Sequence, residues 1–330
     1  MHIGIWADGG PKLGFGHLVR TRTLARELLA RGHRVTYLTQ TPDHVAEVCS
    51  ADSFRVDLLA EGTAESAVSG ALEHGIDVLV VDRGQIPVED QRTMRDALSL
   101  TLVLDADGGT VDCDLVVNGH IYARPEAYDW TGEEPTWCVG GDYLLFDAAL
   151  RRFSRQEPAW NAPPRRALIT MGGSDVGDTT PDAIYAFDGT AIAVDVIVGP
   201  GFQNRKAIDE AVAETDGSFD VAYDPDDLAA RMFRADMAVT SLGLTAYELL
   251  ATRTPFVGIA QAPDQRPKVR ALQEQNAALV LDDSTAEDLS RAVSTLIEDD
   301  SIRRTLFERS RDIVGTDGTA AVADRVEALG

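Results

Sequence analysis

The sequence contains almost no lysine. Of its 30 basic residues, only Lys12, Lys206 and Lys268 are lysines, and 54 acidic residues leave a net charge of −24. Such an acidic, lysine-poor surface is typical of proteins from a very salty cytoplasm, where high net charge maintains solubility. No basic stripe is present that could neutralise a phosphate backbone, so the composition argues against nucleic acid as a partner.

The sequence also lacks long apolar runs. No stretch approaches the ~18 apolar residues that a membrane span requires. The first residues, "MHIGIWADGG", do not show the basic region and apolar run of a signal peptide. We therefore expect a cytoplasmic protein without stable membrane insertion, whose oligomeric state the sequence leaves open.

Cysteine is scarce as well. Cys49, Cys113 and Cys138 are widely separated and form neither a paired motif nor a zinc-ligand spacing. We expect three small core residues, and we expect no metal ion and no cofactor.

Apolar runs alternate with amphipathic stretches along both halves of the chain. In the first half, strands are predicted at 2–8, 33–39, 77–82, 100–107 and 113–119, and a helix at 17–31. In the second half, strands are predicted at 166–171, 191–199, 219–225, 237–241, 255–261 and 277–283, with helices at 227–236, 244–253, 266–276, 285–299 and 301–312 and within 315–330. Near-continuous apolar strands fit parallel sheets that are covered on both faces.

Residues 155–166, "RQEPAWNAPPRR", interrupt this alternation and are interpreted as a linker. The prediction is an α/β protein with two doubly wound domains, 1–158 and 165–330, that face each other across a cleft. Ligands of such sheets bind beyond the carboxyl ends of the strands. The polar residues expected at those ends in the first domain are Asp8, Asp82, Asp105, Asp107 and Asn118.

A glycine-bracketed turn, Gly14-Phe15-Gly16, precedes His17 at the mouth of the first predicted helix. It is not a G-x-G-x-x-G dinucleotide motif, because Val19 occupies the final glycine position. The positive end of a helix disfavours a second positive charge, so we expect a neutral His17 that can act as a general base. The alternative is a histidine that only caps or packs against its own turn.

Two segments of the second half resemble phosphate-binding turns: "ITMGGSD" (169–175) and "TSLGLTAYELL" (240–250). A third segment, "QAPDQ" (261–265), directly follows a predicted strand, and its polar side chains would line the same cleft unless it is only a proline turn. Backbone N–H groups at a glycine turn or a helix N-terminus can bind a diphosphate, and an acid one turn further can accept ribose hydroxyls. The candidate residues are Gly172, Gly173, Ser174, Ser241, Gly243, Leu244, Thr245, Glu248, Asp264 and Gln265. The alternatives are ordinary tight turns, and a capping box in which Glu248 pairs with Thr245.

The order and spacing of these elements resemble one family over nearly the whole chain. It is the UDP-2,4-diacetamido-2,4,6-trideoxy-β-L-altropyranose hydrolases of pseudaminic acid biosynthesis, which are similar in fold to the MurG-like glycosyltransferases with the GT-B fold. The resemblance rests on the G-x-G-H-x-x-R element that ends in Arg20, on MGGSD (171–175), and on the glycine turn before Glu248.

The resemblance implies a role for each matching residue. His17 would activate a water molecule with Asp8 beside it, and Gly16 and Arg20 would help to form the substrate site. The residues implied for the UDP-sugar are Gly172, Gly173, Leu244 and Thr245 around the diphosphate, Glu248 at the ribose, and Asp264 and Gln265 at the nucleotide or the sugar. Water would attack the anomeric carbon and release UDP, with no metal needed if backbone N–H groups stabilise the leaving group.

Three departures from the family pattern affect the sugar half of the predicted site. Trp6 stands where the family has arginine, Arg83-Gly84-Gln85 replaces His-Tyr-Gly after Asp82, and Asp264 replaces asparagine. Two alternatives therefore stay open beside the hydrolase. One is a GT-B glycosyltransferase in which His17 deprotonates an acceptor hydroxyl, and the other is a non-catalytic module that binds nucleotide sugars.

Overall fold

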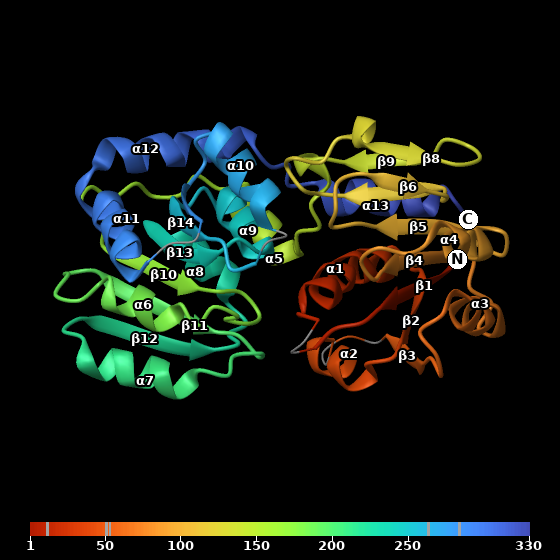
Figure 1. The fold of residues 1–330 in the computed structure, drawn as a ribbon, viewed down its shortest axis with the longest axis horizontal. Coiled ribbons are helices and arrows are strands. Elements are labelled where there is room, and N and C mark those ends of the chain that lie inside the picture. Colours follow the sequence, from red (N-terminus) through yellow and green to blue (C-terminus); the bar gives the residue numbers. More distant parts are fainter. Residues whose placement is uncertain (11–12, 50–51, 53, 263–264, 283–284) are drawn as a thin grey trace. The chain divides into compact units, whose positions relative to one another are not determined.

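The computed structural model describes residues 1–330 except 11–12, 50–51, 53, 263–264 and 283–284 (Figure 1). It divides into two compact units. Unit 1 comprises Met1–Asp147 and Gly315–Gly330, and unit 2 comprises Ala148–Val314. Each unit is built on its own parallel sheet, as the alternating sequence pattern predicts.

The sheet of unit 1 has seven strands in the order β3-β2-β1-β4-β5-β7-β9, and every pairing in it is parallel. The strands are β1 (His2–Ala7), β2 (Arg34–Thr39), β3 (Arg55–Leu58), β4 (Val78–Asp82), β5 (Ser99–Val103), β7 (Leu115–Asn118) and β9 (Thr136–Val139). A separate parallel pair is formed by β6 (Gly109–Val111) and β8 (Tyr128–Trp130). The chain order reverses between β1 and β4, which makes their carboxyl ends the topological switch point of this unit.

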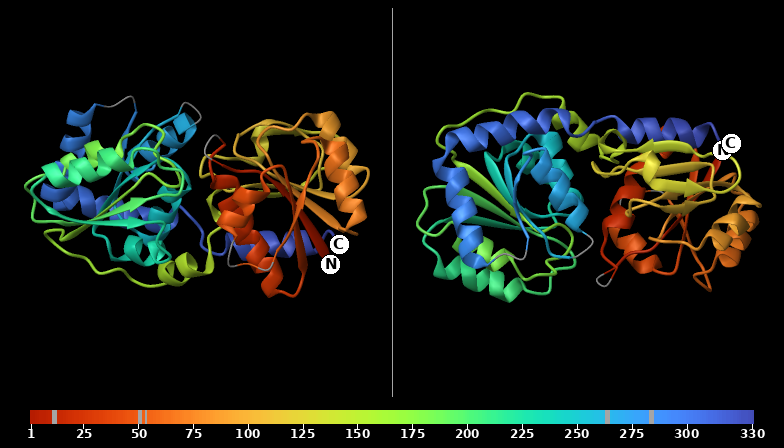
Figure 2. Two further views of the ribbon diagram at one scale, coloured as in Figure 1. Left: turned by 90° about the horizontal axis from the view of Figure 1, so that it is seen from below. Right: turned by 45° about the horizontal axis from the view of Figure 1, so that its top comes forward.

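Helices cover both faces of the unit 1 sheet (Figure 2). They are α1 (Gly16–Ala30), α2 (Pro42–Val48), α3 (Ala64–Glu73), α4 (Val88–Arg95) and α13 (Gly318–Glu327). Ile3 and Ile5 of β1 pack in one apolar cluster with Leu18 and Leu24 of α1. Trp6 packs in the opposite cluster, which includes the alanines of α3 and Met94 of α4. This alternation follows from strand geometry, because successive side chains point to opposite faces.

The C-terminal helix α13 belongs to unit 1 and not to the predicted domain 165–330. Val322 and Val326 are fully buried in the same cluster as α1. Arg31 at the end of α1 donates hydrogen bonds to Asp324 and Glu327, at 2.6 and 2.9 Å. The sequence predicts the helix but cannot tell which of two similar sheets its apolar face will cover.

Unit 2 has a six-stranded parallel sheet in the order β12-β11-β10-β13-β14-β15. The strands are β10 (Arg166–Thr170), β11 (Ala193–Val198), β12 (Ser218–Tyr223), β13 (Met237–Ser241), β14 (Phe256–Ile259) and β15 (Leu279–Leu281). The helices are α5 (Ala148–Ser154), α6 (Thr180–Tyr185), α7 (Arg205–Glu214), α8 (Leu228–Arg234), α9 (Leu244–Thr252), α10 (Arg266–Glu274), α11 (Ala286–Glu298) and α12 (Asp300–Arg309). The switch point of this sheet lies between β10 and β13.

The predicted linker 155–166 is an integral part of unit 2. Asp236 accepts hydrogen bonds from the Asn161 side chain and from the backbone N–H of Arg165, both at 2.8 Å. Glu157 pairs with Arg253 at 2.7 Å. The boundary between the compact units falls before α5 rather than after it, because this helix packs on α8 and α9.

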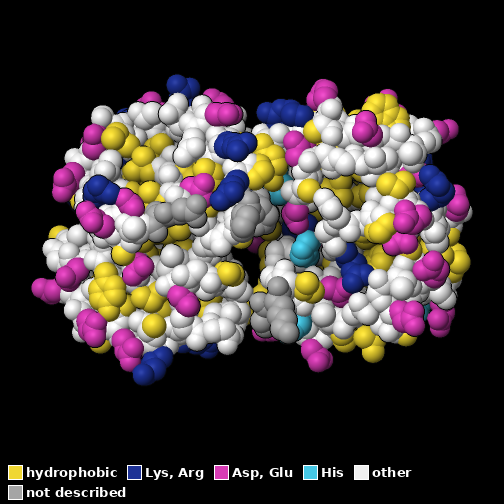
Figure 3. Space-filling view, in the orientation of Figure 1, with side chains coloured by type: hydrophobic (Ala, Val, Ile, Leu, Met, Phe, Trp, Pro, Cys, Tyr) yellow, Lys and Arg dark blue, Asp and Glu magenta, His cyan; other side chains and the backbone are white. Residues whose placement is uncertain are grey.

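Within the described part of the chain, no helix is long and apolar enough to cross a membrane. On the face visible in Figure 3, acidic side chains are scattered over both units, and arginines and lysines stand among them without forming a continuous basic stripe.

Candidate active site

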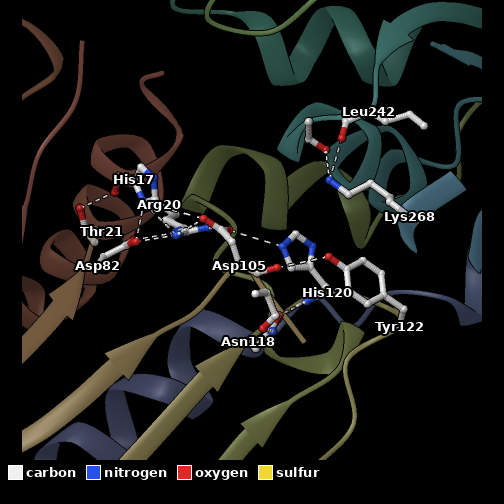
Figure 4. Close-up of polar contacts among 12 residues, drawn as sticks. His17, Arg20, Thr21, Asp82, Asp105, Asn118, His120, Tyr122, Leu242 and Lys268 are labelled. Carbon is white, nitrogen blue, oxygen red and sulfur yellow. Dashed lines mark hydrogen bonds and ion pairs between the residues drawn. The ribbon is translucent and has the colours of Figure 1, made fainter. Parts of the chain in front are cut away.

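The switch point of unit 1 carries a cluster of charged side chains (Figure 4). His17 lies in the first turn of α1, the helix that follows β1, and Asp82 is the last residue of β4. Asp105 follows β5 closely in the chain, and His120 follows β7. The parallel register brings these four residues to one edge, since all four strands end there.

His17 is held by Asp82. Its Nδ1 lies 2.6 Å from Asp82 Oδ1, and the carboxylate is fully buried. Because a carboxylate can only accept, this shorter contact places the proton on Nδ1 and the lone pair of the neutral ring on Nε2, while Arg20 Nη2 lies further away, 3.0 Å from Nδ1. Among the described residues nothing bonds Nε2, and 22% of the His17 side chain is exposed. An imidazole oriented in this way by a buried carboxylate is the arrangement of a general base.

Arg20 bridges the two acids of the cluster. Its Nε donates to Asp82 Oδ2 at 2.6 Å, its Nη2 donates to Asp105 Oδ2 at 2.9 Å, and its Nη1 donates to the other oxygen of Asp105. Arg20 is 8% exposed and lies one turn after His17 on the same helix. The guanidinium is therefore committed to the two carboxylates, and we assign it to positioning the cluster rather than to the predicted substrate contact.

The expectation of a neutral His17 is wrong in direction. Burial by itself would lower the pKa of His17, but the hydrogen bond and the negative charge of Asp82 outweigh it, and the pKa is raised. The α1 dipole contributes only ~0.3–1 kcal/mol against the charge of a cation. A carboxylate at 2.6 Å has the stronger effect, so the basic form is reached at higher pH than in a free histidine.

Replacing Asp82 with asparagine should lower the pKa of His17, because the charge of Arg20 then acts without the opposing carboxylate. The imidazole titration, followed by NMR against a His17→Gln reference, should move to lower pH, and turnover should fall ~10-fold or more as the ring loses its orientation. Asp77→Asn is the matched control, since this acid bonds the His2 backbone N–H at the start of β1. An unchanged titration of His17 in Asp82→Asn would contradict the assigned pairing.

A possible metal site is formed by His17, Asp82 and Asp105, whose ligand atoms lie within 4.8 Å of one another. The sequence did not predict this grouping, since no metal ion was expected. The Arg20 guanidinium already lies between both carboxylates and offsets part of their charge. A divalent ion would have to displace this buried cation, so the donor set fits arginine better than a metal.

Asp8 does not contact His17 by any hydrogen bond among the described residues. One of its oxygens accepts from Thr39 Oγ1 and from the Gln40 N–H, both at 2.7 Å, and the other lies 2.9 Å from Arg83 Nε. The Arg83 guanidinium also stacks over the Trp6 ring, 4.4 Å from its centroid. Two departures from the family pattern are therefore direct neighbours, and Arg83 supplies a positive charge next to Trp6.

The switch point of unit 2 brings the two predicted phosphate-binding segments together. We call residues 172–174 the glycine turn and residues 241–245 the α9 entry. Ser241 Oγ donates to the Met171 carbonyl at 2.9 Å, so this side chain ties the two segments together. A Cβ atom built on Gly172 would stand 3.5 Å from Thr245 Oγ1.

Helix α9 begins without a side-chain cap. Gly243 is the N-cap residue and Leu244 the first helical residue, so the capping box of Thr245 with Glu248 is wrong. The first N–H groups of the helix are thus available to an anion. Lys268 is 5% exposed, and its Nζ donates to the carbonyls of Leu242 and Gly243 at 2.8 and 3.0 Å, which adds positive charge at this turn (Figure 4).

The glycine turn is packed closely by the loop after β11. Gly172 has a φ of +79°, which favours glycine. A Cβ on Gly199 would lie 2.4 Å from the Gly172 carbonyl oxygen, and the Gly201 N–H bonds the Gly173 carbonyl at 2.8 Å. Ser174 Oγ is buried without a partner among the described residues.

The remaining predicted residues are only partly accounted for. Glu248 is half-buried on α9. Gln265 precedes α10 and accepts the Gln261 N–H at 2.8 Å, so its carbonyl supports the loop. Asp264 lies outside the described residues. Gly16 is exposed and is the first residue of α1. No side chain caps this end of the helix, so the alternative prediction that His17 caps its own turn is wrong.

No protein-family model matches the chain. It is 24% identical over 337 residues to the spore coat polysaccharide biosynthesis protein SpsG of Bacillus subtilis, covering 98% of this chain and 96% of SpsG. It is 22% identical over 277 residues to the uncharacterized protein MJ1062 of Methanocaldococcus jannaschii, covering 81% and 57% of the two chains.

Among solved structures, the chain is similar to MurG of Acinetobacter baumannii, with a TM-score of 0.68 and 17% identity over 99% of both chains. The glycosyltransferase of kitacinnamycin gives a TM-score of 0.68 and 17% identity over 99% and 98%. The chain has the GT-B fold. A UDP co-structure of MnaA from S. aureus is similar at a TM-score of 0.63 and 11% identity, over 99% and 96%.

The GT-B fold confirms the predicted fold class, with one doubly wound sheet in each unit. The sequence placed Asp82 and Asp105 at the correct edge but did not assign them to His17, and it gave no role in the site to His120, Asp175 or Lys268. The only usable signal for the first two was their position at strand ends. The hydrolase family itself stays a prediction.

Proposed function

We propose that this chain acts on a UDP-sugar in glycan biosynthesis, with unit 2 binding the diphosphate and unit 1 supplying the base His17. The observation that carries the proposal is the uncapped α9 entry beside the glycine turn at the switch point of unit 2. Backbone N–H groups at such a place bind phosphate without a metal. The match to SpsG supports the assignment to glycan biosynthesis.

Glycosyl transfer is the first candidate reaction. His17 Nε2 takes the proton of an acceptor hydroxyl, whose oxygen attacks the anomeric carbon of the sugar. The bond between that carbon and the β-phosphate oxygen breaks, and UDP leaves with the electron pair. The N–H groups of the α9 entry and the ammonium of Lys268 stabilise the leaving diphosphate. The similarity to MurG and to the kitacinnamycin glycosyltransferase supports this reaction.

Hydrolysis is the second candidate, with water in place of the acceptor hydroxyl. It is supported by the G-x-G-H-x-x-R and MGGSD elements, which resemble the hydrolases of pseudaminic acid biosynthesis. The same His17–Asp82 pair serves both reactions, because each requires removal of one proton from an attacking oxygen.

Two measurements test the proposal. UDP should raise the melting temperature, because it binds only the folded protein, and stabilisation at 100 times the Kd would be ~2.7 kcal/mol. UDP release from a panel of UDP-sugars is then measured at high salt, first without an acceptor and then with a mixture of sugar and lipid-linked acceptors. Release without an acceptor supports hydrolysis, and release only with one supports transfer. No thermal shift at millimolar UDP would overturn the assignment of unit 2.

A further inference from the structure

Asp175 is a buried carboxylate that joins three loops of unit 2. It follows the glycine turn directly, is 8% exposed, and accepts hydrogen bonds from three different chain segments. The donors are the Thr179 N–H at 3.0 Å, Thr179 Oγ1 at 3.1 Å, the Thr180 N–H at 2.8 Å, Asn204 Nδ2 at 2.9 Å and Gln261 Nε2 at 3.0 Å.

Each of these segments follows a strand of the same sheet. Asp175 itself follows β10, Asn204 follows β11, and Gln261 follows β14. In the strand order β11-β10-β13-β14, strands β11 and β10 lie on one side of β13 and β14 lies on the other. Strand β13 leads into the α9 entry. The carboxylate therefore connects the loops on either side of the proposed diphosphate site.

The contacts continue from Asp175 into the site. The loop that carries Asn204 also holds the glycine turn through the bond from Gly201 to Gly173. Gln261 in turn donates its backbone N–H to Gln265, at the start of α10. Burial by itself would raise the pKa of Asp175, but the hydrogen bonds from Thr180, Asn204 and Thr179 lower it, so the group is ionised near neutral pH and accepts all of these bonds.

We propose that Asp175 is a positioning residue for the nucleotide diphosphate: it fixes the three loops so that the N–H groups of the glycine turn and the α9 entry converge on both phosphates. This inference rests on the proposed function. It assigns Asp175 no contact with the ligand, and its effect passes through the backbone that it holds. A site with pre-arranged N–H groups gains affinity because less order must be imposed on binding.

Calorimetric binding of UDP and UMP to Asp175→Asn tests the inference. Asparagine replaces one carboxylate oxygen with an NH2 group, which cannot accept the hydrogen bonds that hold the three loops. The loops should therefore be less well ordered, and the Kd for UDP should rise about tenfold or more. The affinity ratio of UDP over UMP should also fall, because the β-phosphate relies on the arranged N–H groups. Simple destabilisation of the fold would weaken both ligands equally and leave the ratio unchanged. Asp178→Asn is the matched control, since Asp178 is exposed on the same loop and its φ of +50° suits asparagine.

Asn204→Ala provides a second, milder variant that removes one of the three loop contacts. It should lower the UDP-over-UMP ratio less than Asp175→Asn does, with circular dichroism verifying that both variants are folded. If the unaltered protein does not bind UDP, the proposed function fails. If the unaltered protein binds UDP and both variants keep its ratio, the proposed function stands and the role of Asp175 is refuted.

Discussion

Replacing His17 with glutamine should reduce turnover of the UDP-sugar ~10²–10⁴-fold, the range that a general base contributes. Glutamine still offers an amide to Asp82 but cannot take up a proton near neutral pH. The Kd for UDP should stay within about twofold of the unaltered protein, because the proposed nucleotide contacts belong to unit 2 and binding is measured separately from chemistry. Single-turnover UDP release and calorimetry measure the two quantities.

The matched control for this prediction is His33→Gln. His33 also pairs with a carboxylate, Glu327 at 2.6 Å, but it precedes β2 at the amino end of the sheet. Its replacement should leave turnover unchanged. Turnover that survives in His17→Gln would make the His17–Asp82 pair structural and would move the search for a base to another residue at this edge.

The pH dependence of turnover should follow the same pair. Because the pKa of His17 is raised, the basic form accumulates only at higher pH than for a free histidine, and turnover should increase through that pKa. The contribution of His17 to the stability of the fold changes with pH in the opposite direction to turnover. A histidine whose pKa is raised on folding stabilises the protein below its unfolded pKa, and this contribution is lost as the pH rises through the folded value.

The strands and helices next to the candidate site could be predicted closely from the sequence. The segment 237–241 is β13 without any shift, and the helix predicted at 17–31 is observed at Gly16–Ala30. Both segments combine a continuous apolar pattern with glycines that mark the turn. The edge strand β3 (Arg55–Leu58) was not predicted, because it has only four residues and its apolar side chains, Val56 and Leu58, are exposed rather than part of a core.

The partners within the site could not be predicted, since they depend on strand order. The sequence places Asp8 and Asp82 at the same edge of the sheet, and the family resemblance implies that Asp8 lies beside His17. The hydrogen bonds show another partner, because Asp82 at the end of β4 bonds His17 while Asp8 bonds Thr39 and Gln40 at the end of β2. The paired acids also reverse the expected direction of the His17 pKa shift, a charge effect that no local pattern encodes.

Arg20 should have the largest effect on stability. Arg20→Met removes the cation that Asp82 and Asp105 share and leaves a fully buried carboxylate without its main partner, which should cost about 3–5 kcal/mol. Arg26→Met is the matched control on the same helix. Its pair with Asp52 at 2.8 Å is partly exposed, with 40% of the arginine side chain accessible, so the cost should stay below about 1 kcal/mol.

Urea unfolding in a Trp160→Phe background measures this difference, because the three remaining tryptophans, Trp6, Trp130 and Trp137, all report on unit 1. Arg20 holds the pKa of Asp105 far below its usual range although partial burial opposes this shift, so in the unaltered protein this acid stabilises the fold at neutral pH. In Arg20→Met, Asp105 becomes easier to protonate, and acidification from about pH 7.5 to 5 should relieve part of the cost. A loss that equals that of Arg26→Met, or that does not shrink at low pH, would contradict the view that one buried arginine is the shared partner of both acids and thereby holds Asp82 against His17.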